Sequence, residues 1–260
     1  MKVQMLIRLL LICFCLSMMI ASAKAGMKEG IDFYNNRHEG SNGALASTVN
    51  ISKAIEHFSR AIKISETEKV AALYLIKSYY YKAEFAIQDG EEQKKIFNEG
   101  KALGDNYIKK YPDSAEIRYW YLVNLGSWAQ IYGILTAARE GVADQMKIHS
   151  EKIIELDLEY QDGGGYFMLG AVHFKSPYIP FLLSWPDNDD AIKFLQLAHD
   201  TGEATLNQKN YLAQAIFKDG QTEMAKKILN EVINTVPNPD YLVEELDDIK
   251  EALQLLEDLY

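Results

Sequence analysis

The residues of this chain best suited to acid–base or metal chemistry are its five histidines, and they are scattered along the sequence. None lies in an HExxH pair, and none has an acidic residue at a spacing that would complete a plausible zinc site. No nucleophile can be paired with a base either. We therefore expect no enzyme, no cofactor and no metal site from His38, His57, His149, His173 and His199.

Two short motifs resemble ligand-binding loops without completing them. Asp187-Asn188-Asp189-Asp190 has acids at alternate positions, as calcium loops do, but Ala191 takes the next ligand position and no glutamate follows in register. A helix N-cap is the better interpretation. The triplet Gly163-Gly164-Gly165 follows a predicted helix and lacks the lysine of a phosphate loop, so it predicts a flexible turn into the next helix.

An aromatic ridge is predicted on one face of a helix that spans about residues 116–139. Trp120, Asn124, Trp128 and Tyr132 recur every four residues, so their side chains share that face. Interior packing explains the aromatic rings. It does not explain Asn124, whose amide must either find a buried partner or face a groove.

A proline-rich apolar insert, residues 174–190, is the second unusual feature. It holds three of the six prolines in the chain, and proline restricts the backbone at low entropic cost, so the insert is expected to be ordered. Its apolar side chains either plug the concave face of the fold or present a patch to a partner. The ridge, the insert and the helix before it supply the candidate ligand- or partner-binding residues: Trp120, Asn124, Trp128, Tyr132, Tyr166, His173, Tyr178, Phe181 and Trp185.

A helical repeat supplies the elements that position these residues. Residues 206–237 match the tetratricopeptide pattern, in which Ala213 and Ala225 let two antiparallel helices approach closely and Gly220 ends the first of them. The same pattern fits residues 163–198 once about nine residues are allowed for the insert. Gly170 and His173 then take its glycine and tyrosine positions.

About five helix pairs can be counted along the chain, and no strand pattern is found, so the sequence predicts an all-α, tetratricopeptide-like solenoid. Residues 26–260 form a single helical repeat domain in this interpretation. Residues 239–260 are acidic and carry leucines at helical spacing. They predict a C-terminal capping helix whose polar face keeps the open end of the solenoid soluble.

The N-terminus predicts export. Lys2 and Arg8 precede an apolar run over residues 9–21, which is too short to span a bilayer comfortably, and Ala23-Lys24-Ala25 offers the small residues that a signal peptidase uses. We expect residues 1–25 to be a cleavable signal peptide and the protein to be periplasmic. Neither Cys13 nor Cys15 follows a lipoprotein-processing motif, and both would leave with the signal peptide, so no disulfide is expected.

The charge of the chain excludes one class of partner. Residues 1–25 contain three basic residues and no acid, so their removal lowers the net charge from −10 to −13. A protein this acidic repels nucleic acid. We therefore expect no nucleic-acid partner.

Several motifs occur in an order that resembles the T component of tripartite ATP-independent periplasmic (TRAP) transporters, over roughly residues 45–237. The motifs are residues 119–129, residues 155–160, the glycine triplet with Tyr166 and Leu169-Gly170, the insert, and the helix with Ala191, Phe194 and Ala198. The resemblance implies a periplasmic helical-repeat protein that associates with the solute-binding protein of such a transporter. It also implies that Trp120, Asn124, Gly126, Gly164, Gly170 and the insert belong to the family core.

The chain departs from that family at two points. Pro186-Asp187-Asn188-Asp189 replaces a Gly-Gly-Asp turn at the end of the insert, and Leu158 replaces a proline. The leading hypothesis is a non-enzymatic periplasmic accessory protein that binds a solute-binding protein, an apolar-bodied small organic solute, or both; self-association into a homo-oligomer stays open. The alternative is a general exported scaffold that docks peptides or envelope proteins.

Overall fold

The computed structural model describes residues 24–181 and 183–259, and its regular elements are all helical in this part of the chain. Residues 24–35 form the first described helix. The predicted signal peptide, with Cys13 and Cys15, lies outside the described residues apart from Lys24 and Ala25. The remaining elements are α2 (Thr48–Ala61), α3 (Glu68–Tyr81), a π-helical turn η1 (Lys82–Ala86), α4 (Gly90–Lys110), α5 (Ala115–Tyr132), α6 (Ile134–Arg139), α7 (Val142–Leu156), α8 (Gly164–Lys175), α9 (Asn188–His199), α10 (Leu206–Lys218), α11 (Thr222–Ile233), a 3₁₀ turn η2 (Pro239–Tyr241) and α12 (Leu242–Asp258).

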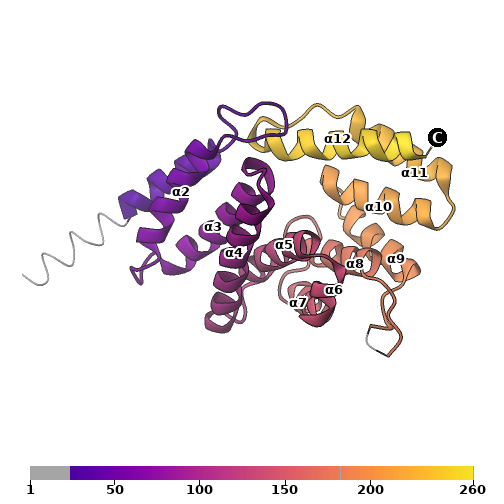
Figure 1. Cartoon of the computed structure of the whole chain (residues 1–260), viewed down its shortest axis with the longest axis horizontal. Coiled ribbons are helices and arrows are strands. Elements are labelled where there is room, and N and C mark those ends of the chain that lie inside the picture. The colour runs from indigo at the N-terminus through magenta and orange to yellow at the C-terminus, as the bar shows by residue number, and fades with distance from the viewer. Residues whose placement is uncertain (1–23, 182, 260) are drawn as a thin grey trace, which may run out of the picture.

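Neighbouring helices pack in pairs that follow one another around an arc (Figure 1). Helix 24–35 pairs with α2, α3 with α4, α5 with α7, α8 with α9, and α10 with α11. This arrangement confirms the predicted all-α, tetratricopeptide-like solenoid of about five helix pairs. Within the described residues, no helix is both long enough and apolar enough to cross a membrane.

The last pair shows why these residues form a repeat. Ala213 in α10 and Ala225 in α11 are fully buried where the two helices meet, as the small-residue pattern predicts. Thr205 caps α10 in a capping box with Gln208. Gly220 adopts a φ of +85°, a left-handed conformation that glycine takes without strain, and it separates the two helices.

The predicted helix over residues 116–139 is wrong in its extent, because it is two helices. Helix α5 ends at Tyr132, Gly133 has a φ of +84°, and α6 begins at Ile134. A residue with this φ cannot continue a right-handed helix. The two large apolar residues that begin α6, Ile134 and Leu135, are 59% and 72% exposed.

The glycine triplet also differs from the prediction of a flexible turn. Gly163 does form a left-handed turn, with a φ of +73°. Gly164 and Gly165, however, are buried in the first turn of α8, where an added Cβ would lie 2.5 Å from the Tyr119 ring and 2.7 Å from Ile154. They are glycines because helices approach closely there.

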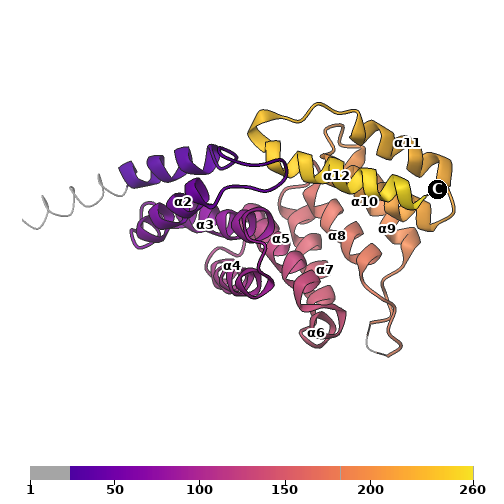
Figure 2. The same cartoon turned by 45° about the horizontal axis from the view of Figure 1, so that its top comes forward.

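The C-terminal helix α12 closes the arc (Figure 2). It packs against α10 and α11, and its other end reaches the segment after the first helix, where Arg37 contacts Glu244. Val243 joins the apolar cluster of the N-terminal helices, whereas Ala252 joins the larger cluster formed by the other helices. Helix α12 therefore connects the two cores of the molecule.

Candidate functional site

The predicted site residues lie in three places: along α5, at the base of the insert, and at the tip of the insert. On α5, Trp128 and Tyr132 face α4. Their rings stack at 4.4 Å between centroids, the Trp128 Nε1–H donates to Asn98 Oδ1 at 2.7 Å, and Asn98 Nδ2 donates to the Tyr132 hydroxyl at 2.8 Å. This network fixes α5 on α4.

Asn124 is fully buried between α3, α4 and α5. Its Nδ2 donates to the carbonyl oxygens of Ile76, at 3.1 Å, and of Trp120, at 2.9 Å. Its Oδ1 lies against Gly100, where an added Cβ would come within 2.1 Å of that oxygen. Of the two alternatives for this amide, the structure shows the buried partner, and Asn124 does not face a groove.

Trp120 belongs to a different environment, an aromatic cage around an amine. The Lys77 Nζ lies 5.1 Å from the Tyr34 ring centroid, 5.1 Å from that of Tyr74 and 4.9 Å from that of Trp120. In the described part of the chain, no carboxylate lies within ion-pair distance of this amine. Burial, together with the charge of Arg37, lowers the pKa of Lys77 to about 8.

No local residue pattern predicts this cage. Lys77 lies among tyrosines on α3, whereas Tyr34 belongs to the first helix and Trp120 to α5. These side chains come together only when the helix pairs stack. The rotation between stacked pairs cannot be predicted from the spacing of the repeats.

The base of the insert is anchored by Trp185. Its ring contacts His173 edge-on at 4.8 Å, its Nε1–H donates to Asp144 Oδ1 at 2.9 Å, and the Lys147 Nζ lies 4.7 Å from the ring centroid. His173 is buried, and burial lowers its pKa. Tyr166 stacks with Phe194 at 6.5 Å, so it packs α8 against α9.

The structure also brings His173 near two acids that sequence spacing did not connect with it. Potential ligand atoms of His173, Asp187 and Asp190 all lie within 4.8 Å of one another. Existing hydrogen bonds account for the arrangement: Asp187 Oδ1 accepts from the Asp190 N–H at 2.9 Å and caps α9, and His173 Nδ1 accepts from the Asp187 N–H at 3.4 Å. The cluster therefore forms the N-cap of α9.

Near the tip of the insert, Tyr178 and Phe181 are exposed to solvent. Ile179 and Leu183 form a small antiparallel bridge with backbone hydrogen bonds of 2.7 and 2.8 Å, and Leu183 is buried. Phe181, between them, has a φ of +66° and is fully exposed, and Tyr178, just before Ile179, is 64% exposed. A bulky apolar residue in a left-handed conformation, presented to water by an anchored loop, suits contact with another molecule.

This arrangement predicts opposite behaviour for two aromatic residues of the insert. Phe181→Ser is expected to change the free energy of unfolding by no more than about 0.5 kcal/mol, because the ring packs against nothing. Trp185→Ser is expected to cost about 2 to 4 kcal/mol, because it removes the contacts with His173 and Asp144. Thermal melting of the two variants is the measurement, and equal losses would contradict an exposed tip.

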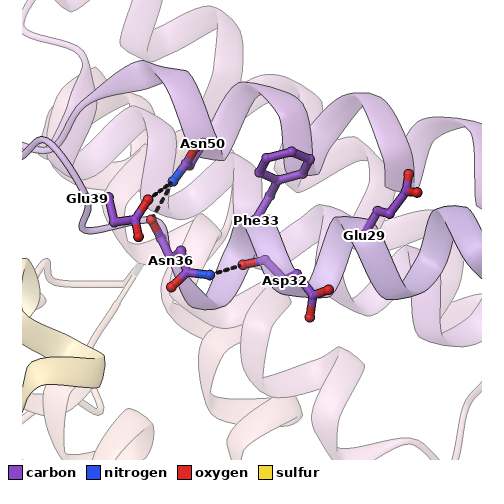
Figure 3. Close-up of a pocket in the computed structure, with 6 residues that line it drawn as sticks. All are labelled: Glu29, Asp32, Phe33, Asn36, Glu39 and Asn50. Carbon is purple, nitrogen blue, oxygen red and sulfur yellow. Dashed lines mark hydrogen bonds between the residues drawn. The ribbon is translucent and has the colours of Figure 1, made fainter.

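A separate surface hollow of about 240 Å³ lies on the outer side of the first helix pair (Figure 3). Glu29, Asp32 and Phe33 come from the first helix, and Asn50 comes from α2. The Asn50 amide is already engaged, because its Nδ2 donates to Asn36 O at 2.8 Å and to Glu39 Oε2 at 3.0 Å. None of the predicted site residues lines this hollow.

Among solved structures, a thermophilic TPR protein of Thermus thermophilus has a similar fold. The two share 13% sequence identity at a TM-score of 0.59, over 89% of this chain and 99% of that one. No family model and no curated protein matches the sequence. At this identity the likeness shows the tetratricopeptide-like fold and nothing finer.

Proposed function

We propose that the protein is a non-enzymatic scaffold that binds another protein through the tip of its insert. The observation that carries the proposal is the fully exposed Phe181, held away from the helical body by a loop that Trp185 anchors. An isolated exposed aromatic ring costs free energy in water, and aromatic anchors are the side chains most enriched at the centres of protein interfaces. The tetratricopeptide-like fold supports a scaffold role.

The finer proposal concerns the partner. The motif order that resembles the TRAP transporter T component favours a periplasmic solute-binding protein as the molecule that meets the insert. Export of the chain through its N-terminal segment belongs to the same proposal. An apolar-bodied organic solute carried by that partner would then be handed over near Phe181 and Tyr178.

The test is capture from the envelope fraction of the source cells with tagged protein. Wild type and Trp185→Phe, which keeps an aromatic anchor, are expected to recover one solute-binding protein. Phe181→Ser is expected to lose it while its melting temperature stays unchanged.

The recovered set decides between the two candidate functions. Recovery of several unrelated proteins by the wild type, each dependent on Phe181, would favour the general scaffold over the TRAP component. Recovery that Phe181→Ser leaves unchanged would contradict the insert as the docking element.

A further inference from the structure

Helix α12 lies against the arc through both apolar and polar contacts, and its partly buried Ile249, Leu255 and Leu256 pack against the larger core. Of its 17 residues, Val243 and Ala252 alone are buried. The amides of α10 donate to acceptors on α12: Asn207 Nδ2 donates to Asp248 Oδ1 at 3.0 Å, and Asn210 Nδ2 donates to the backbone carbonyl oxygen of Asp248 at 2.8 Å. Gln214 on the same face donates more weakly to Glu251, at 3.4 Å. A row of amides on α10 therefore donates to backbone and side-chain acceptors of α12.

The other end of α12 is held by one cation. Arg37 Nε and Nη2 both donate to Glu244 Oε1, at 2.9 and 2.6 Å, and Nη2 also donates to the Asp240 carbonyl at 2.9 Å. Arg37 is 4% exposed and lies over the rings of Tyr34, Tyr81 and Tyr241. The Arg37 guanidinium therefore gives this end of the surface a preference for a carboxylate.

The link between α11 and α12 is a short segment without regular secondary structure. Residues 234–238 contain no regular element, and Val236 within them is 87% exposed. The link is connected to α12 itself, because the Asn238 N–H donates to Glu245 Oε2 at 2.6 Å. Opening α12 therefore does not require α10 or α11 to unfold.

We propose that α12 is a displaceable built-in occupant of the α10 and Arg37 surface, and that this surface binds an acidic amphipathic helix of a partner protein in its place. The inference rests on the proposed scaffold function and names a second contact, separate from the insert. The partner helix carries an acid at the position of Glu244, which pairs with Arg37, and side-chain hydrogen-bond acceptors at the positions of Asp248 and Glu251, where the amides of α10 donate.

Docking of α12 is opposed by the burial of its own acids. Burial, helped by the Glu251, Asp247 and Glu245 carboxylates on α12 and opposed by the hydrogen bond from Asn207, raises the pKa of Asp248 to about 7. From the packed elements, Asn207 and Tyr211 of α10 and Tyr80 of α3 face Asp248, and the buried Glu84 of η1 lies near Asp247. Two cations lie near these acids: Lys250 acts on Asp247, and Lys175 of α8 interacts with Glu251.

The sign of the pH dependence follows from the raised pKa of Asp248. Asp248 binds a proton more readily in the docked state than in the free helix, so its contribution to docking is largest below about pH 3.8 and is lost as the pH rises through about 7. Helix α12 is therefore held less tightly at pH 8 than at pH 5.5.

Native-state hydrogen exchange on the full-length chain tests whether α12 opens alone. After correction for intrinsic rates, α12 amides are expected to exchange faster than those of α10 and α11, and faster at pH 8 than at pH 5.5. Asp248→Asn is expected to remove that pH dependence. Exchange of α12, α10 and α11 at one common rate at both pH values would overturn the proposal, because α12 would then open only with the whole fold.

Binding in trans tests the surface itself. A fluorescent peptide of residues 239–259 is titrated against wild type and Glu244→Gln, whose own helix leaves Arg37 without a carboxylate. The variant is expected to bind the peptide about ten-fold more tightly than wild type. A control peptide with glutamine at position 244 is expected to lose that gain.

No binding of either peptide to a Glu244→Gln chain that circular dichroism shows to be folded would overturn the proposal. The capture experiment through Phe181 is unaffected by this outcome. A failure of the α12 surface is therefore distinguishable from a failure of the scaffold function.

Discussion

Gly170→Ala is expected to lower the free energy of unfolding by about 3 to 5 kcal/mol. The added Cβ would lie 2.7 Å from Leu195 Cγ, 2.9 Å from Leu195 N and 3.1 Å from Ala191 O. Two of these atoms belong to the backbone of α9, so no side-chain rotation relieves the contact and the two helices must separate. Overpacking of a core typically costs about 1 to 3 kcal/mol and more when the backbone must shift, against a gain of about 1 kcal/mol in helix propensity.

Gly126→Ala is the matched control for this prediction. It is also a glycine inside a helix, but its added Cβ would meet only Met146 Cε, at 3.8 Å, which is ordinary contact. It is expected to be neutral or stabilising by up to about 1 kcal/mol. Urea denaturation of the two variants gives both values. A loss below about 1 kcal/mol for Gly170→Ala would show that α8 and α9 approach less closely than the structure indicates.

Asn124→Asp is expected to destabilise the fold by about 3 to 5 kcal/mol at pH 8, since it places an ionised carboxylate in a fully buried position. The substitution also removes the two N–H donors that now serve Ile76 O and Trp120 O. Two buried carbonyls would face a negative charge instead of a donor.

The pH dependence of the stability loss in Asn124→Asp shows whether burial of the new carboxylate causes it. Burial raises the pKa of the new carboxyl above its value in the unfolded chain, so the stability difference from wild type is smallest below that unfolded value and grows as the pH rises. Denaturation at pH 4.5 and at pH 8 measures it. Asn98→Asp is the control, because Asn98 is exposed and a carboxylate there still accepts from Trp128 Nε1. Equal losses for the two variants would argue against burial as the cause.

The repeat could be predicted from the sequence because its signals are local. Ala213, Ala225 and Gly220 each act within one helix pair, so spacing alone specifies their roles. The break at Gly133 could not be predicted in the same way, because the apolar pattern continues on both sides of it. A single glycine inside a helical pattern is compatible with either outcome.

The candidate site was harder to predict, because its contacts cross between repeats. The spacing of Trp120, Asn124, Trp128 and Tyr132 placed them on one helix, but their partners come from α3, α4 and the loop before α8. The Lys77 cage depends on the rotation between the first helix, α3 and α5, and the contact of Arg37 with Glu244 depends on the curvature of the whole arc. That curvature is the sum of small rotations, and no local residue pattern encodes it.

The contact between Arg37 and Glu244 joins residues 207 positions apart, which changes how the number of repeats can vary. An open solenoid tolerates the gain or loss of a helix pair, because each pair contacts only its neighbours. Here an additional pair would carry Glu244 past Arg37 and leave the buried Arg37 guanidinium without its carboxylate. The contact between Arg37 and Glu244 therefore restricts the number of helix pairs that lie between them, and duplication of an internal pair would also require this contact to be rebuilt.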